Sequence, residues 1–159
     1  MVRKKGVLAW LYLAKVYGLI SKMSEREFRQ YGLTTAKFDI IAHLGIAPEG
    51  LNQCDLARRL LVSRGNISGV IDRMEKDGLI IREREKDDRR YYRVKLSEKG
   101  KKIFRRVVPK HEKNIEKLFS VLTEEEKREL KSLLGKLFRS LREKNKVGGV
   151  KNGKCTYSF

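Results

Sequence analysis

The sequence has few of the residues that build cross-linked, metal-binding or catalytic proteins. It contains two cysteines, two histidines, two prolines and one tryptophan in 159 residues. Cys54 and Cys155 stand about a hundred residues apart with no neighbours at metal-ligand spacing, which argues against a disulfide framework or a zinc module. His43 and His111 have no plausible nucleophile or carboxylate pair near them, and there is no glycine-rich phosphate loop. We therefore expect no enzyme, no cofactor and no metal site.

Long apolar runs are also missing. The run over residues 7–14 follows three basic residues, as in a signal peptide, but Lys15 ends it and no small-residue cleavage site follows. No stretch reaches the roughly 18 apolar residues that a membrane span requires. Cys155 stands fifth from the end, so the last residues do not form a prenylation box. These absences predict a cytoplasmic protein with no membrane partner.

Positive charge, by contrast, is plentiful. There are 38 basic and 20 acidic residues, a formal net charge of +18, and residues 97–159 alone hold 18 basic and 8 acidic residues. Such an excess favours a polyanion as partner, although a solvated helix surface explains it equally well. Hydrophobic residues still make up 40% of the chain, enough for a core, and the length favours one domain with helical extensions.

The two ends of the chain predict helices with large apolar surfaces. Apolar residues over 7–20 go nearly all round a helix, which then needs partners on more than one side. Near the other end, Thr123 and Glu126 form a capping box, and leucines and Phe138 over 130–141 make a sharp apolar stripe. An intramolecular bundle would bury these surfaces, but the pattern over 7–20 favours an interface with a second subunit.

The middle of the chain predicts a helix-turn-helix. Thr34 is a suitable N-cap for one helix, Asn52 with Asp55 opens a second, and Ser63 caps a third after a three-residue turn. The third helix carries an apolar stripe at i, i+3, i+4 and i+7 and stops at Gly78. The stripe consists of Ile67, Val70, Ile71 and Met74.

A change of periodicity after Gly78 predicts a β-hairpin. Residues 79–85 and 91–96 read as two strands around a charged tip. Ser97 then opens a long helix to about Leu122, which we expect Pro109 to kink or split. Residues 144–159 look like a flexible basic tail.

A helix-turn-helix followed at once by a two-stranded wing, with long helices on both sides, resembles the MarR family of bacterial transcriptional regulators. Residues 51–80 (LNQCDLARRLLVSRGNISGVIDRMEKDGLI) and 87–100 (DDRRYYRVKLSEKG) carry the resemblance. Asp88, Arg89 and Arg90 match the family's wing signature, and Leu96, Ser97 and Gly100 match its exit from the strand into the next helix. The resemblance implies a fold that is mainly α with a small β-hairpin wing. It divides the chain into an N-terminal dimerisation helix (1–33), a winged helix-turn-helix (34–98), C-terminal dimerisation helices (99–143) and the tail (144–159).

Double-stranded DNA is the partner that this reading predicts for the third helix. With the apolar stripe inward, Gly65, Gly69, Asp72 and Lys76 lie at the centre of the outer face. Two glycines on an exposed helix suggest a backbone that comes close to the floor of the major groove, or else a tolerant first turn. The expected DNA-contacting residues of this helix are Ser63, Arg64, Gly65, Asn66, Ser68, Gly69 and Arg73.

The charged tip of the hairpin can be interpreted either as an ordinary solvent-exposed turn or as a contact to the DNA minor groove. The resemblance favours Arg89 and Arg90 in the minor groove, with Asp88 orienting them. It also implies a cleft for a small aromatic or phenolic anion between the dimer helices and the winged unit. Trp10, Tyr17, Phe38 and His43 are candidates to line that cleft, although ordinary core packing is the alternative for most of them.

The functional expectation is a homodimeric, sequence-specific DNA-binding regulator, a repressor on a palindromic operator that a small aromatic or phenolic ligand releases. Two alternatives remain. The first is a non-specific, chromosome-associated DNA-binding protein driven by the +18 charge. The second is a winged helix that binds protein partners.

Overall fold

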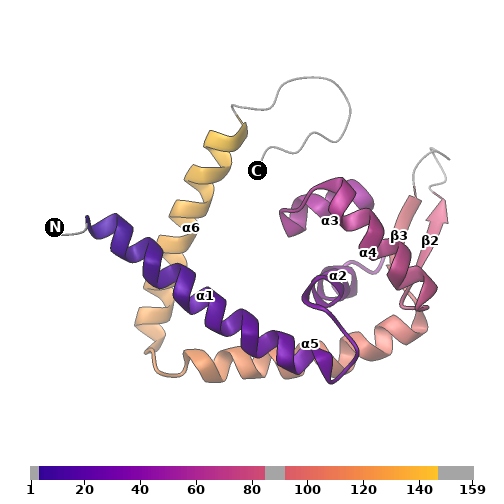
Figure 1. Ribbon diagram of the computed structural model, residues 1–159, viewed down its shortest axis with the longest axis horizontal. Helices are drawn as coiled ribbons and strands as arrows, with labels where there is room; N and C mark the ends of the chain where they lie inside the picture. Colours follow the sequence, from indigo (N-terminus) through magenta and orange to yellow (C-terminus); the bar gives the residue numbers. More distant parts are fainter. Residues whose placement is uncertain (1–3, 85–91, 147–159) are drawn as a thin grey trace.

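The protein is mainly helical, with a small sheet at one side (Figure 1). The computed structural model describes residues 4–84 and 92–146. The elements of this part are α1 (Lys5–Arg29), α2 (Thr35–Gly45), β1 (Leu51–Asn52), α3 (Gln53–Leu60), α4 (Arg64–Lys76), β2 (Ile80–Arg84), β3 (Tyr92–Leu96), α5 (Glu98–Phe119) and α6 (Glu124–Lys146). The expected class, helices with a small β wing, is confirmed.

Local capping signals start the helices where the sequence predicts. The side chains of Thr34, Asn52 and Ser63 each accept a hydrogen bond from the backbone N–H three residues on, and so begin α2, α3 and α4. The capping box before α6 is also formed: Thr123 N–H donates to Glu126 Oε2 at 2.7 Å, and Glu126 N–H donates to Thr123 Oγ1 at 3.2 Å.

The sheet has three strands in the order β1-β3-β2, all antiparallel. The hairpin pairs Ile80 with Leu96 at its base and Arg84 with Tyr92 at its outer end. The sequence prediction missed β1, in which Leu51 pairs with Val94. A strand of two residues has no periodicity to recognise, and its only cause is this long-range pairing.

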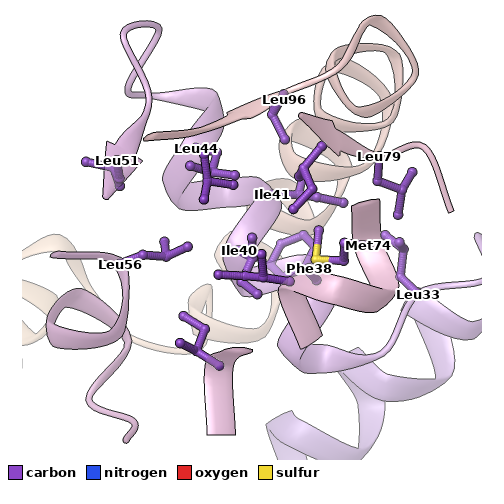
Figure 2. Packing of buried hydrophobic residues seen from close by; sticks show 14 of the residues in the cluster. Leu33, Phe38, Ile40, Ile41, Leu44, Leu51, Leu56, Met74, Leu79 and Leu96 are labelled. Carbon is purple, nitrogen blue, oxygen red and sulfur yellow. The ribbon is translucent and has the colours of Figure 1, made fainter. Parts of the chain in front are cut away.

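One hydrophobic core joins α2, α3, α4, the sheet and the first half of α5. Figure 2 shows Phe38, Ile40, Ile41 and Leu44 of α2 at its centre, with Leu56 and Met74 arriving from α3 and α4. The apolar stripe of α4 is inward as predicted, since Ile67, Ile71 and Met74 are buried and Val70 packs against the cluster.

The strand-to-helix exit depends on Gly100. A Cβ at this position would lie 2.1 Å from the carbonyl oxygen of Leu79, so only glycine allows α5 to pack against the end of α4. Ser97 fixes the same junction, because its hydroxyl caps α5 and donates to the Gly78 carbonyl at 2.6 Å.

Pro109 does not split α5, which corrects part of the sequence prediction. The helix continues from Glu98 to Phe119 with Pro109 inside it. Pro109 is exposed, so the carbonyl that lacks a helical donor lies on the solvent side.

Many apolar residues of α1 and α6 are exposed in the part of the chain that the structure describes. Trp10, Tyr17 and Leu19 of α1 are 64%, 70% and 65% exposed, and only Phe28, near the end of α1, is buried. In α6, Leu133 and Leu137 are 58% and 50% exposed. Figure 1 shows why, since the first half of α1 and the whole of α6 extend away from the group formed by α2, α3, α4 and the sheet.

Candidate DNA interface

The turn between α3 and α4 sets the angle at which α4 is presented. Leu61 has φ 55° and ψ 36°, the left-handed conformation that ends α3, and Val62 N–H donates to the Ala57 carbonyl at 3.1 Å. Ser63 then caps α4 by accepting from Asn66 N–H at 3.2 Å. The three-residue turn expected over 61–63 is therefore present.

The outer face of α4 is open within the chain. Gly65, Asn66 and Arg73 are exposed, and Ser63, Ser68 and Gly69 are partly exposed. A Cβ at Gly65 would meet no atom within 4 Å, and at Gly69 only the Arg73 guanidinium, at 3.6 Å. Packing therefore does not require glycine at either position. Arg64 begins α4, but its side chain lies outside the described part of the structure.

An ion-pair clamp on Arg82 joins α4 to the wing. The Arg82 guanidinium of β2 binds Asp72, and it also lies 3.5 Å from the Glu75 carboxylate. The sequence reading placed Asp72 at the centre of the free face, whereas the structure turns its carboxylate toward the wing. Nothing in the sequence near Asp72 marks this partner, because Arg82 comes from another element.

The C-terminal end of α4 is held by a second set of contacts. Lys37 Nζ of α2 lies 2.6 Å from Asp77 Oδ2, and Lys99 Nζ donates to the Asp77 carbonyl at 2.7 Å. The hydrogen bond from Lys37 lowers the pKa of Asp77 below its ordinary value. These contacts tie the C-terminal half of α4 to α2, α5 and the wing.

The described part of the wing carries polar contacts between β2 and β3. Arg84 Nε donates to the Tyr92 hydroxyl at 3.1 Å, and Lys95 pairs with Glu83 at 2.9 Å. The predicted minor-groove residues Arg89 and Arg90, and the orienting Asp88, lie outside the described residues.

The four candidate ligand residues do not form one site within the chain. Phe38 is buried and stacks on Phe28 with ring centroids 4.0 Å apart, while His43 is partly buried on the same helix. Trp10 precedes Phe28 by 18 residues of α1, about 27 Å along the axis. Both Trp10 and Tyr17 point to solvent.

A hollow of about 360 Å³ instead lies between the end of α1 and the middle of α5. Its polar wall is Glu27, whose carboxylate lies 3.1 Å from His111 Nδ1 and accepts from Asn114 Nδ2 at 2.9 Å. Both Glu27 and His111 are largely buried, with side chains 12% and 16% exposed. No local sequence signal marks this pair, because 84 residues separate its members.

Asp39 of α2 lies near this hollow in a partly buried position. Burial raises the pKa of its carboxyl above the ordinary value of 3.8, while the positive field of His43 and His111 partly opposes the rise.

Within residues 4–84 and 92–146, no three His, Cys, Asp or Glu side chains gather as metal ligands would. In the same part of the chain, every helix is too short or too polar to span a bilayer. Cys54 is partly buried at the beginning of α3.

Comparison with known proteins bears on this arrangement. A protein-family model described as MarR family matches residues 31–90, from the end of α1 into the wing. The HTH-type transcriptional regulator PecS of Dickeya dadantii is 30% identical over 131 residues, which cover 81% of this chain and 79% of that protein. This chain belongs to the MarR family.

Solved structures agree with the family assignment. The crystal structure of AbsC, a MarR family transcriptional regulator from Streptomyces coelicolor, is similar with a TM-score of 0.83 and 28% identity, covering 90% of this MarR-family chain and 98% of AbsC. The regulator RdhR-CbdbA1625, in its 2,4-dichlorophenol bound form, is similar with a TM-score of 0.77 and 31% identity, covering 87% of this chain and 82% of RdhR-CbdbA1625.

Family membership makes this MarR-family chain a DNA-binding transcriptional regulator with a winged helix. The family is one of transcription regulators and not of enzymes.

Proposed function

We propose that the chain acts as a homodimeric, sequence-specific transcriptional repressor on a palindromic operator. The observation that supports this most is the outer face of α4, which is polar and open. Ser63, Arg64, Gly65, Asn66, Ser68, Gly69 and Arg73 are the proposed major-groove contacts, and Arg89 and Arg90, oriented by Asp88, are the proposed minor-groove contacts.

The dimer is proposed from the uncovered apolar surfaces of residues 1–33 and 99–143. A two-fold axis through these helices would present two copies of α4 to half-sites about one helical turn, ~34 Å, apart. Residues 34–98 form the DNA-binding unit in this proposal, and residues 144–159 a basic tail.

Release by a small aromatic or phenolic ligand is the second part of the proposal. The structure of RdhR-CbdbA1625 with 2,4-dichlorophenol supports a ligand of this chemical class in a relative of 31% identity. Because Trp10 and Tyr17 lie far along α1 from Phe38 and His43, a cleft lined by all four would need side chains from both subunits.

Selection from random duplexes followed by competition tests the proposal. At moderate salt, the dimer should hold a selected palindrome against excess random duplex, and changing Arg89 and Arg90 to alanine should weaken this binding. Equal affinity for the palindrome and random DNA would instead support a non-specific DNA-coating protein, because counterion release alone has no sequence preference. Binding that Arg89→Ala and Arg90→Ala leave unchanged would favour a protein-binding winged helix.

A panel of phenolic acids added to the palindrome complex tests ligand release. Loss of the complex at micromolar to millimolar ligand, with no loss of dimer, is the expected result. A complex that survives every member of the panel would count against a phenolic effector.

A further inference from the structure

The surface of α5 separates its charges by face. Six basic residues recur at spacings of three and four, and therefore form a single stripe along the helix. They are Lys99, Lys102, Arg106, Lys110, Lys113 and Lys117, and all six are exposed. We call this set the α5 basic stripe.

No acidic residue of α5 lies on the α5 basic stripe. At 100° per residue, Glu98, Glu112 and Glu116 all fall on a different flank of the helix, where Lys101 pairs with Glu98 at 2.7 Å. Among the described residues, no salt bridge joins a member of the stripe to a carboxylate. Like charges three or four residues apart destabilise a helix. A mixture of positive and negative charges would keep the surface equally soluble without this cost. Solubility therefore does not explain the pattern.

The middle of the stripe is held in place by Tyr31, from the turn after α1. The Arg106 guanidinium and the Lys110 ammonium lie 5.4 and 5.3 Å from the centre of the Tyr31 ring. Lys110 also donates to the Tyr31 hydroxyl at 2.9 Å, which raises the pKa of Lys110 and keeps it charged. Two of the six cations are therefore positioned before any partner arrives.

Apart from Lys99, whose ammonium donates to the Asp77 carbonyl at the end of α4, the stripe faces away from the proposed DNA surface. Val107 and Val108 of α5 are buried against the core on the other side of the helix from the stripe. Figure 1 shows α2 between α5 and the pair α3–α4, and the buried face of α4 is turned toward α2. A straight duplex that lies on α4 therefore does not reach the α5 basic stripe.

We propose that the α5 basic stripe binds the phosphate backbone of a second segment of duplex DNA, so that one protein holds two segments. Its six cations extend over 18 residues, about 27 Å, which matches about 8 base pairs at 3.4 Å each. Five of the six are lysines, point charges that suit phosphates rather than base edges, so this contact has no sequence preference. This proposal depends on the proposed function only for the binding of the first duplex; the second duplex is bound by the α5 basic stripe.

A two-duplex capture measurement tests the proposal. One duplex is fixed to a sensor surface, the full-length protein is bound to it, and a 20-base-pair random duplex is then passed over. The test variant carries Lys102→Gln, Lys113→Gln and Lys117→Gln, three stripe residues that form no ion pair with the described residues. The matched control carries Lys136→Gln, Arg139→Gln and Lys144→Gln, exposed cations of α6 that remove the same charge without forming one stripe.

Wild type and the α6 control should capture the second duplex, and the stripe variant should bind the first duplex but capture the second at least tenfold more weakly. Raising salt from 50 to 200 mM should weaken capture by about 10³-fold in wild type, and by only about 40-fold with three contacts removed. Equal capture by the stripe variant would overturn the proposal, because a second duplex would then be bound by the α4 of the other subunit.

Two further outcomes separate this proposal from others. If wild type binds the first duplex but never a second, the stripe proposal fails and the proposed function stands. If it binds no duplex at all, both fail. Stripe-dependent binding to vesicles of phosphatidylglycerol and phosphatidylcholine, without capture of a second duplex, would replace DNA by an anionic membrane surface as the partner.

Discussion

Gly69 offers the most direct test of how closely α4 approaches a duplex. Alanine at this position meets only a guanidinium in the free protein, so Gly69→Ala should raise the free energy of unfolding by about 0.5–1 kcal/mol. If the backbone of α4 lies against the groove floor, the same methyl group should weaken duplex binding. Denaturant unfolding and duplex titration measure the two effects.

A matched control for this prediction is Gly135 in α6, where a Cβ would meet only the Arg139 guanidinium, at 3.4 Å. Gly135→Ala should stabilise the fold by a similar amount and leave duplex affinity unchanged. Unchanged affinity in Gly69→Ala as well would mean that the glycine is merely tolerated in α4.

Asp39 gives a prediction about pH. Its pKa in the folded state is raised above the unfolded value near 3.8, so its contribution to stability is fully present below pH 3.8 and is lost as the pH rises through the folded pKa. Asp39→Asn, which is neutral throughout, should therefore be more stable than wild type at pH 7. The two proteins should converge in unfolding free energy near pH 3.5; a constant difference across this range would show that the ionisation of Asp39 is not its cause.

At the scale of elements, the largely buried pair Glu27–His111 connects α1 to α5. Glu27→Ala leaves His111 and Asn114 without their acceptor, which should cost about 1–3 kcal/mol of unfolding free energy. Glu27→Gln keeps an acceptor oxygen and should cost less. Thermal unfolding of the two variants checks the order, and equal losses would indicate that packing rather than hydrogen bonding is responsible.

The sequence predicted those elements whose causes are local. Thr34, Asn52 and Ser63 cap their helices through contacts three residues away, and the periodic stripe of α4 fixes its buried face. The strand β1 was missed because it exists only through pairing with β3. Pro109 was expected to interrupt α5, but at an exposed position the packing of the flanking residues outweighs one lost hydrogen bond.

The candidate site was predictable only in part for the same reason. Which face of α4 is outward follows from periodicity, but the contact of Asp72 with Arg82 depends on where the wing lies. The aromatic ligand candidates were chosen by residue type, and Trp10 and Phe38 lie too far apart in one chain to share a pocket.

At the scale of the whole molecule, the apolar face of α6 predicts the oligomeric state. Leu137 is half-exposed in the chain, and a carboxylate there would have to be buried in any interface built on this face. Leu137→Glu should therefore raise the dimer dissociation constant by at least about 10²-fold. Sedimentation equilibrium measures it, with Ser132→Glu, exposed on the other side of α6, as the control. A dimer that tolerates Leu137→Glu as well as Ser132→Glu would place the interface elsewhere.

The uninterrupted course of α5 links the two ends of the protein mechanically. Its 22 residues make a rod of about 33 Å, fixed to the winged unit at Gly100 and to α1 near His111. Tilting such a rod by about 5° displaces its far end by about 3 Å. In the proposed dimer, a small rotation of α5 would therefore change the distance between the two α4 helices, because no turn interrupts α5.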